Sequence, residues 1–112
     1  MGMKQYRIDE LRPSDYQTLK NHLDHQYGPP EMGGIYWIPL DEDQLSPIQK
    51  QHPDCRPFFF AVDLEETAVS CELLVRTRKR IRCDCIQYAS EEQRNWLIRL
   101  IDTMFEDLDV KT

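Results

Sequence analysis

Between residues 57 and 88 apolar and polar side chains alternate, which is the period of β-strands with one buried face. A two-residue turn at Glu65 and Glu66 aligns the inward side chains of the first two strands and places Phe60 opposite Cys71. We therefore predict a three-stranded antiparallel β-meander over about residues 57–88. Its inward positions are Phe58, Phe60, Val62 and Leu64, then Val69, Cys71, Leu73 and Val75, then Ile81, Cys83 and Cys85.

The C-terminal part of the chain changes to a helical period. Ser90 and Gln93 have the spacing of a capping box, which marks a helix start. We predict a long amphipathic helix over residues 90–109 that packs on one face of the sheet, and hence an α+β fold. The apolar stripe of this helix consists of Trp96, Leu97, Leu100, Ile101, Met104, Phe105 and Leu108.

The N-terminal half predicts further short elements. Residues 4–9 are expected to form a strand. A helix is expected to start at Ser14, which forms a capping box with Gln17, and to stop at Gly28. A strand over residues 35–40 should end at Pro39, and a short helix is expected around residues 44–52. With 112 residues the chain fits one α+β domain, residues 1–112, that folds without a disulfide or a metal.

Charge is distributed unevenly along this acidic chain, whose formal net charge is −6. A basic run over residues 76–82 holds five of the 14 basic residues, so nine remain elsewhere against 20 acidic ones. The run is interpreted either as a solvated hairpin tip that discourages edge pairing or as a docking site for an acidic partner. Nucleic acid is not expected, because the molecule is acidic and the run has no aromatic residues. The basic residues are Arg76, Arg78, Lys79, Arg80 and Arg82.

Four large apolar side chains fall on the outward face of the predicted meander: Phe59, Leu74, Ile86 and Tyr88. An exposed apolar patch of this kind needs a cover. The cover is either the segment 35–52 of the same chain, or a partner protein or second copy.

The four cysteines allow two interpretations. In the first, Cys71, Cys83 and Cys85 project from flat strands into the core and pack as small apolar side chains. In the second, they form a metal or thiol-redox site with His52 or Cys55, because His-x-x-Cys and Cys-x-Cys spacings can supply zinc ligands. The first interpretation is favoured, since structural zinc usually takes its ligands from turns.

Neither a nucleophile elbow nor a glycine-rich phosphate loop occurs in the sequence. The sequence therefore favours a non-enzymatic binding or adaptor domain without a cofactor, which contacts its partner through the basic run or the outward apolar side chains. A metal-binding or thiol-redox protein is the alternative. Residues 1–6 lack the apolar core of a signal peptide and no stretch approaches 18 apolar residues, so a cytoplasmic protein without membrane contact is expected.

Overall fold

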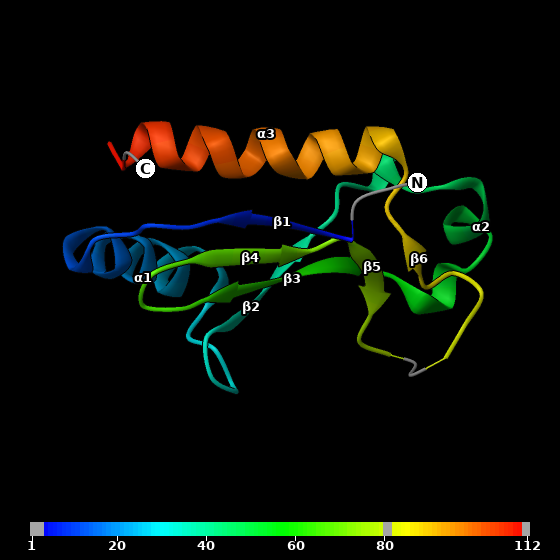
Figure 1. Cartoon of the computed structure of the whole chain (residues 1–112). Helices are drawn as coiled ribbons and strands as arrows, with labels where there is room; N and C mark the ends of the chain where they lie inside the picture. The colour runs from blue at the N-terminus through cyan, green and yellow to red at the C-terminus, as the bar shows by residue number, and fades with distance from the viewer. Residues whose placement is uncertain (1–3, 80–81, 111–112) are drawn as a thin grey trace.

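In the computed structural model, which describes residues 4–79 and 82–110, an antiparallel six-stranded sheet is combined with three α-helices (Figure 1). This confirms the predicted α+β class. The strands are β1 (Gln5–Ile8), β2 (Ile35–Pro39), β3 (Phe58–Leu64), β4 (Val69–Glu72), β5 (Leu74–Thr77) and β6 (Gln87–Tyr88). The helices are α1 (Pro13–Tyr27), α2 (Pro47–Lys50) and α3 (Glu91–Asp107), with short 3₁₀ helices at Glu42–Gln44 and Pro53–Cys55.

Strand β3 is the centre of the sheet. It pairs with β2 along one edge, and with β4 and β5 along the other. Strands β4 and β5 form one long run that is interrupted at Leu73. The Leu73 N–H donates to the carbonyl of Lys4 (3.0 Å), and the Leu73 carbonyl accepts from the N–H of Ala89 (2.7 Å). Leu73 is therefore the point at which the long run changes its outer neighbour from β1 to β6.

The register of the central hairpin differs from the predicted one by two residues. Val62 lies opposite Cys71, and Leu64 lies opposite Val69. The reason is the turn: Glu65 and Ala68 exchange backbone hydrogen bonds, so the tip lies one residue later than Glu65 and Glu66. Because the error is an even number of residues, the predicted inward side chains of the first two runs still face the core.

The prediction that Cys83 and Cys85 lie on a third strand is wrong. Cys83 to Cys85 lie in a turn, which is closed by a hydrogen bond of 3.0 Å from the N–H of Ile86 to the carbonyl of Cys83. Among the described residues of the predicted third strand, only Gln87 and Tyr88, which form β6, pair with β5. Ile81, which was placed on the same strand, lies outside the described residues.

Helix α3 covers the inner face of the sheet, as predicted. Its N-terminus has the expected capping box: the Ser90 hydroxyl accepts from the Gln93 N–H, and the Gln93 side chain accepts from the Ser90 N–H. Leu97 is fully buried, and the Trp96 ring stacks on Phe60 with a centroid distance of 6.3 Å. Each large side chain buried in this way contributes roughly 1.5–3 kcal/mol to the free energy of unfolding.

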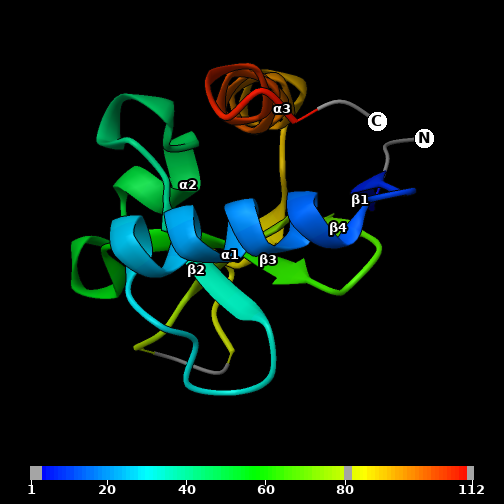
Figure 2. The same ribbon diagram turned by 90° about the vertical axis from the view of Figure 1, so that its left-hand side faces the viewer.

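Helix α1 runs crosswise to α3 at one end of the sheet, as Figure 2 shows with α3 viewed along its axis. It buries Leu19 and Leu23 in the same core, and its Asp24 accepts a hydrogen bond from the Tyr36 hydroxyl of β2. It ends at Gly28, as predicted, where a φ of 84° suits a residue without a side chain. None of the helices in the described part of the chain combines the length and apolar character that crossing a bilayer requires.

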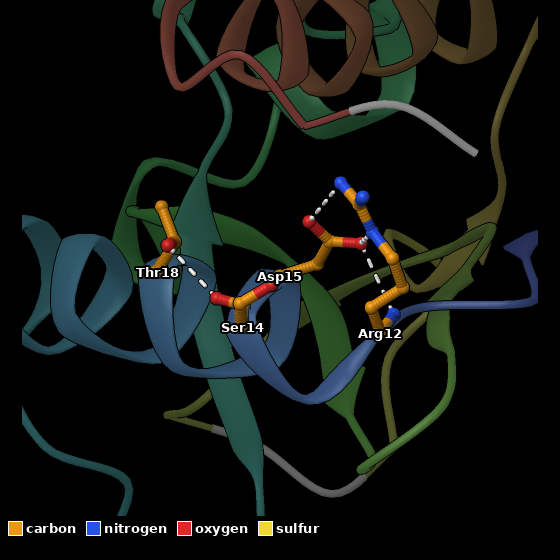
Figure 3. Close-up of polar contacts among 4 residues, drawn as sticks. All are labelled: Arg12, Ser14, Asp15 and Thr18. Carbon is orange, nitrogen blue, oxygen red and sulfur yellow. Dashed lines mark hydrogen bonds and ion pairs between the residues drawn. The ribbon is translucent and has the colours of Figure 1, made fainter.

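The start of α1 differs from the prediction, because Arg12 rather than Ser14 precedes the first helical residue. The Asp15 carboxylate accepts from the Arg12 backbone N–H (3.0 Å) and from the Arg12 guanidinium (3.0 and 3.1 Å), whereas the Ser14 carbonyl accepts from the Thr18 hydroxyl one turn further on (Figure 3). Pro13 supplies the fixed φ of a first helical residue. The predicted pair of Ser14 and Gln17 is therefore wrong by two residues.

We expect Asp15→Asn to destabilise the protein at neutral pH and to do so less in acid. The hydrogen bonds from Arg12 lower the pKa of Asp15, so the carboxylate stabilises the fold fully above its unfolded-state pKa of about 3.9. That contribution is lost as the pH falls through the still lower folded-state pKa. Urea unfolding between neutral pH and pH ~2 measures the difference, with exposed Asp43→Asn as control. If Asp15→Asn lowered the free energy of unfolding by the same amount at every pH, this role of the Asp15 charge would be contradicted.

Candidate functional site

One histidine and three cysteines meet at the end of the molecule that holds α2 and β6 (Figure 1). The candidate ligand atoms of His52, Cys83 and Cys85 all lie within 4.8 Å of one another. The Cys55 sulfur lies 3.9 Å from the Cys83 sulfur. The structure thus brings together four of the five residues that the sequence offered for a metal site. We call these four residues the His-Cys cluster.

Two short turns present the four side chains. In the first, Pro53–Cys55 forms a 3₁₀ helix in which the Cys55 N–H donates to the carbonyl of His52 at 3.0 Å. In the second, Cys83 and Cys85 flank Asp84 in the tight turn before β6. The sequence argued against a zinc site because the cysteines were expected on flat strands. That argument does not hold for the His-Cys cluster, because its side chains come from turns. Turns are where the backbone can wrap around a metal ion.

The distance between one pair of sulfurs fits a tetrahedral ion. With a zinc–sulfur distance of about 2.3 Å, two sulfurs on a tetrahedron are about 3.8 Å apart. The distance between Cys55 and Cys83 is 3.9 Å, close to that edge. Cysteine sulfur and histidine nitrogen are the donors that structural zinc sites use, and three cysteines with one histidine form one of the common sets.

The side chains and carbonyls around the cluster hold it in place. The Nδ1 atom of His52 lies 2.7 Å from the carbonyl of Ile48. Since a carbonyl only accepts, Nδ1 carries the proton and Nε2 is left free to bind a metal. The fully buried Gln49 donates from Nε2 to the Cys85 carbonyl (3.2 Å), and the Thr77 hydroxyl donates to the Cys55 carbonyl.

The thiols influence one another electrostatically. The Cys85 thiol and the Cys85 backbone N–H donate to Cys83 and lower the pKa of Cys83, with smaller contributions from Cys55 and His52. Burial raises the pKa of Cys85 to about 12, and hydrogen bonding with Cys83 adds to that rise. Cys83 therefore ionises more readily than an ordinary thiol, whereas ionising Cys85 next to it is unfavourable. A bound divalent cation removes this conflict.

Cys71 does not belong to the cluster, which corrects the predicted set. It lies in β4 on the inner face of the sheet and is only 1% exposed. Burial raises the pKa of Cys71 to about 12, with a smaller contribution from the carboxylate of Asp102. For this residue, the core-packing interpretation is confirmed.

The basic run extends along β5 and into the loop that follows. Arg76 forms an ion pair with Glu72 (2.8 Å). Arg78 is 3.4 Å from Glu31, and its guanidinium lies over the Trp37 ring. Acidic residues of the chain itself thus neutralise part of the run. Lys79 and Arg82 are exposed, and Arg80 lies outside the described residues. A partner at this run remains a prediction.

The four outward apolar residues have different environments. Phe59 makes an edge-to-face contact with Trp37 of β2, at a centroid distance of 6.2 Å, so the segment 35–52 supplies part of its cover. Leu74 is half-buried. Ile86 packs against the core, so its outward placement was wrong. Tyr88 is 53% exposed, with the Lys4 ammonium 5.6 Å from its ring centroid. The role of these residues in binding a partner also remains a prediction.

Comparisons with family models, curated proteins and solved structures found no match for this chain. A function therefore has to be inferred from the geometry of its own residues. The sequence interpretation missed Gln49 and Thr77, which hold the ligands through backbone carbonyls. A signal for Gln49 was present: Ser46 and Gln49 have the capping-box spacing around Pro47, which fixes the start of α2 at Pro47, five residues before His52.

Proposed function

We propose that this chain is a small metal-binding domain that holds one zinc ion with Cys55, Cys83, Cys85 and the Nε2 atom of His52. The observation that carries the proposal is the convergence of three thiols and one imidazole from two turns: the ligand atoms of His52, Cys83 and Cys85 lie within 4.8 Å of one another, and the Cys55 sulfur lies 3.9 Å from that of Cys83. The tetrahedral spacing of two of the sulfurs and the protonated Nδ1 of His52 support it.

The proposed role of the ion is structural. Four protein ligands fill a tetrahedral zinc ion and leave no position for a substrate, which is the arrangement of structural rather than catalytic sites. The ion would join the turn at Cys55 to the turn at Cys83, next to the two-residue strand β6. Such an ion is compatible with a non-enzymatic binding domain, the function that the sequence favoured. Cytoplasmic location stays part of this proposal.

Elemental analysis of the purified protein tests the proposal. We expect about one equivalent of zinc per chain after zinc is supplied and excess is removed by gel filtration. Cobalt(II) in place of zinc should give the visible bands of a tetrahedral ion together with sulfur-to-cobalt charge transfer. Less than about a tenth of an equivalent, with three cluster thiols that react freely with a thiol reagent, would contradict the proposal.

A further inference from the structure

We propose that Cys83 is a site of oxidation by hydrogen peroxide, and that Cys55 then forms a disulfide with it and releases the metal. This inference rests on the proposed metal site and adds a means of control to it. It starts from a difference in access among the three cluster thiols. Cys85 is fully buried and Cys55 is 1% exposed, whereas Cys83 is only half-buried.

A surface pocket leads a small oxidant to Cys83. The pocket has a volume of about 340 Å³, and the cluster residues His52, Cys55 and Cys83 lie in its wall together with Arg82. The buried Cys85 is not among its lining residues. A hydrogen peroxide molecule is little larger than water, so it fits in this pocket, next to the half-buried Cys83.

The reaction balances with peroxide as the only oxidant. The Cys83 sulfur attacks one peroxide oxygen, the O–O bond breaks, and the departing hydroxide takes a proton to become water. The sulfur is now a sulfenic acid. The Cys55 sulfur, which carries no proton while it serves as a metal ligand, then attacks the Cys83 sulfur: an S–S bond forms, the S–O bond breaks, and the hydroxide takes a proton from the solvent and leaves as water. Two thiolates, one peroxide and two protons from the solvent give one disulfide and two waters.

Cys55 is the resolving thiol for geometric reasons. Its sulfur is 3.9 Å from that of Cys83, so the two must approach by about 2 Å to reach disulfide bonding distance. The two cysteines lie on separate turns, so the bond closes a large loop of the chain. Cys85 is also near, but a disulfide between residues two apart closes a small, strained ring. The metal would lose two of its four ligands in the step and would be released.

The experiment treats the zinc-loaded protein with hydrogen peroxide. Zinc release is followed with a zinc-binding dye, and the cysteines are mapped by digestion and mass spectrometry without reduction. We expect one zinc released per chain, a loss of two hydrogen atoms from the chain mass, and a Cys55–Cys83 crosslink. Reduction with dithiothreitol should restore zinc binding. In the metal-free protein, Cys83→Ser should abolish the disulfide of Cys55 that forms with peroxide, because the sulfur that reacts first is removed.

Other outcomes would overturn the inference. Zinc that stays bound after peroxide treatment would do so, as would a crosslink between Cys83 and Cys85, or an irreversible sulfinic acid at Cys83 with no disulfide. The mapping uses the unaltered protein, so it does not depend on whether the Cys83→Ser variant folds. A protein that binds no zinc would contradict the proposed function instead. In that case the metal-free protein still shows by the same mapping whether Cys55 and Cys83 form the disulfide.

Discussion

Cys85→Ala is expected to weaken zinc binding by more than about 100-fold, because changing a residue that merely supports a metal ligand already costs about 10–100-fold. The variant removes one of four proposed ligands and leaves an open position on the ion. Competition with a chelator of known affinity measures the effect. Thermal unfolding gives a second measurement: zinc at about 1,000 times its dissociation constant stabilises the folded state by about 4 kcal/mol, and the variant should lose that gain.

Cys71→Ala is a matched control for this experiment. Both thiols are almost completely inaccessible, and the pKa of each is raised to about 12, chiefly by burial. Both substitutions remove a buried sulfur from the described part of the fold. They differ in location, since Cys71 lies in β4, whereas Cys85 lies in the turn before β6 and in the His-Cys cluster. Equal losses of zinc affinity in the two variants would contradict the ligand assignment, whereas a loss for Cys85 alone supports it.

The parts of the fold that the sequence predicted correctly are those fixed by local periodicity. The stripe from Trp96 to Leu108 repeats with the period of a helix, and the structure buries it against the sheet. The alternation from Phe58 to Leu64 likewise fixes which side chains face inward. Neither result depends on knowing which strand lies next to which, so short-range patterns are sufficient.

The register and the third strand depend on tertiary structure and could not be read in this way. Glu65 and Glu66 were as suitable for a turn tip as Glu66 and Thr67, and the hydrogen-bonded pair of Glu65 and Ala68 decided between them. The spacing of Cys83 and Cys85 suits both a strand and a tight turn, since both can place residues two apart on one side. The structure forms the turn, and β6 begins only at Gln87.

In the candidate site, too, local sequence patterns predicted some features, whereas others depend on tertiary structure. The sequence offered both pairs, His52 with Cys55 and Cys83 with Cys85, but had no means of bringing them together. The buried side chain of Gln49 links the two segments, from α2 to the carbonyl of Cys85. Including Cys71 in the set is wrong because a third strand through Cys83 and Cys85 would have placed them beside Cys71, whereas β6 begins only at Gln87.

Gln49→Leu is expected to lower both the stability of the protein and its affinity for zinc. Gln49 is fully buried, and its Oε1 atom accepts from the Ser46 N–H (2.9 Å) and from Gln93 Nε2 (2.9 Å). Its Nε2 atom donates to the Cys85 carbonyl. Leucine fills a similar volume but offers none of these bonds, and each buried polar group left without a partner costs about 1–3 kcal/mol. Because Gln93 keeps its bond to the Gln44 carbonyl, we expect a total loss of about 2–4 kcal/mol in urea unfolding.

The effect on zinc separates a role in positioning the ligand from a purely structural one. If Gln49 holds the Cys85 turn in the geometry that the ion needs, zinc affinity should fall about 10–100-fold at a temperature where the variant is fully folded. The visible spectrum of the cobalt(II) form should then show a distorted site. Gln17→Leu is the control, because this glutamine is exposed on α1 and bonds only locally, to Asn21. A Gln49→Leu variant that is less stable but binds zinc as tightly as the unaltered protein would show that Gln49 supports the core and not the ligand.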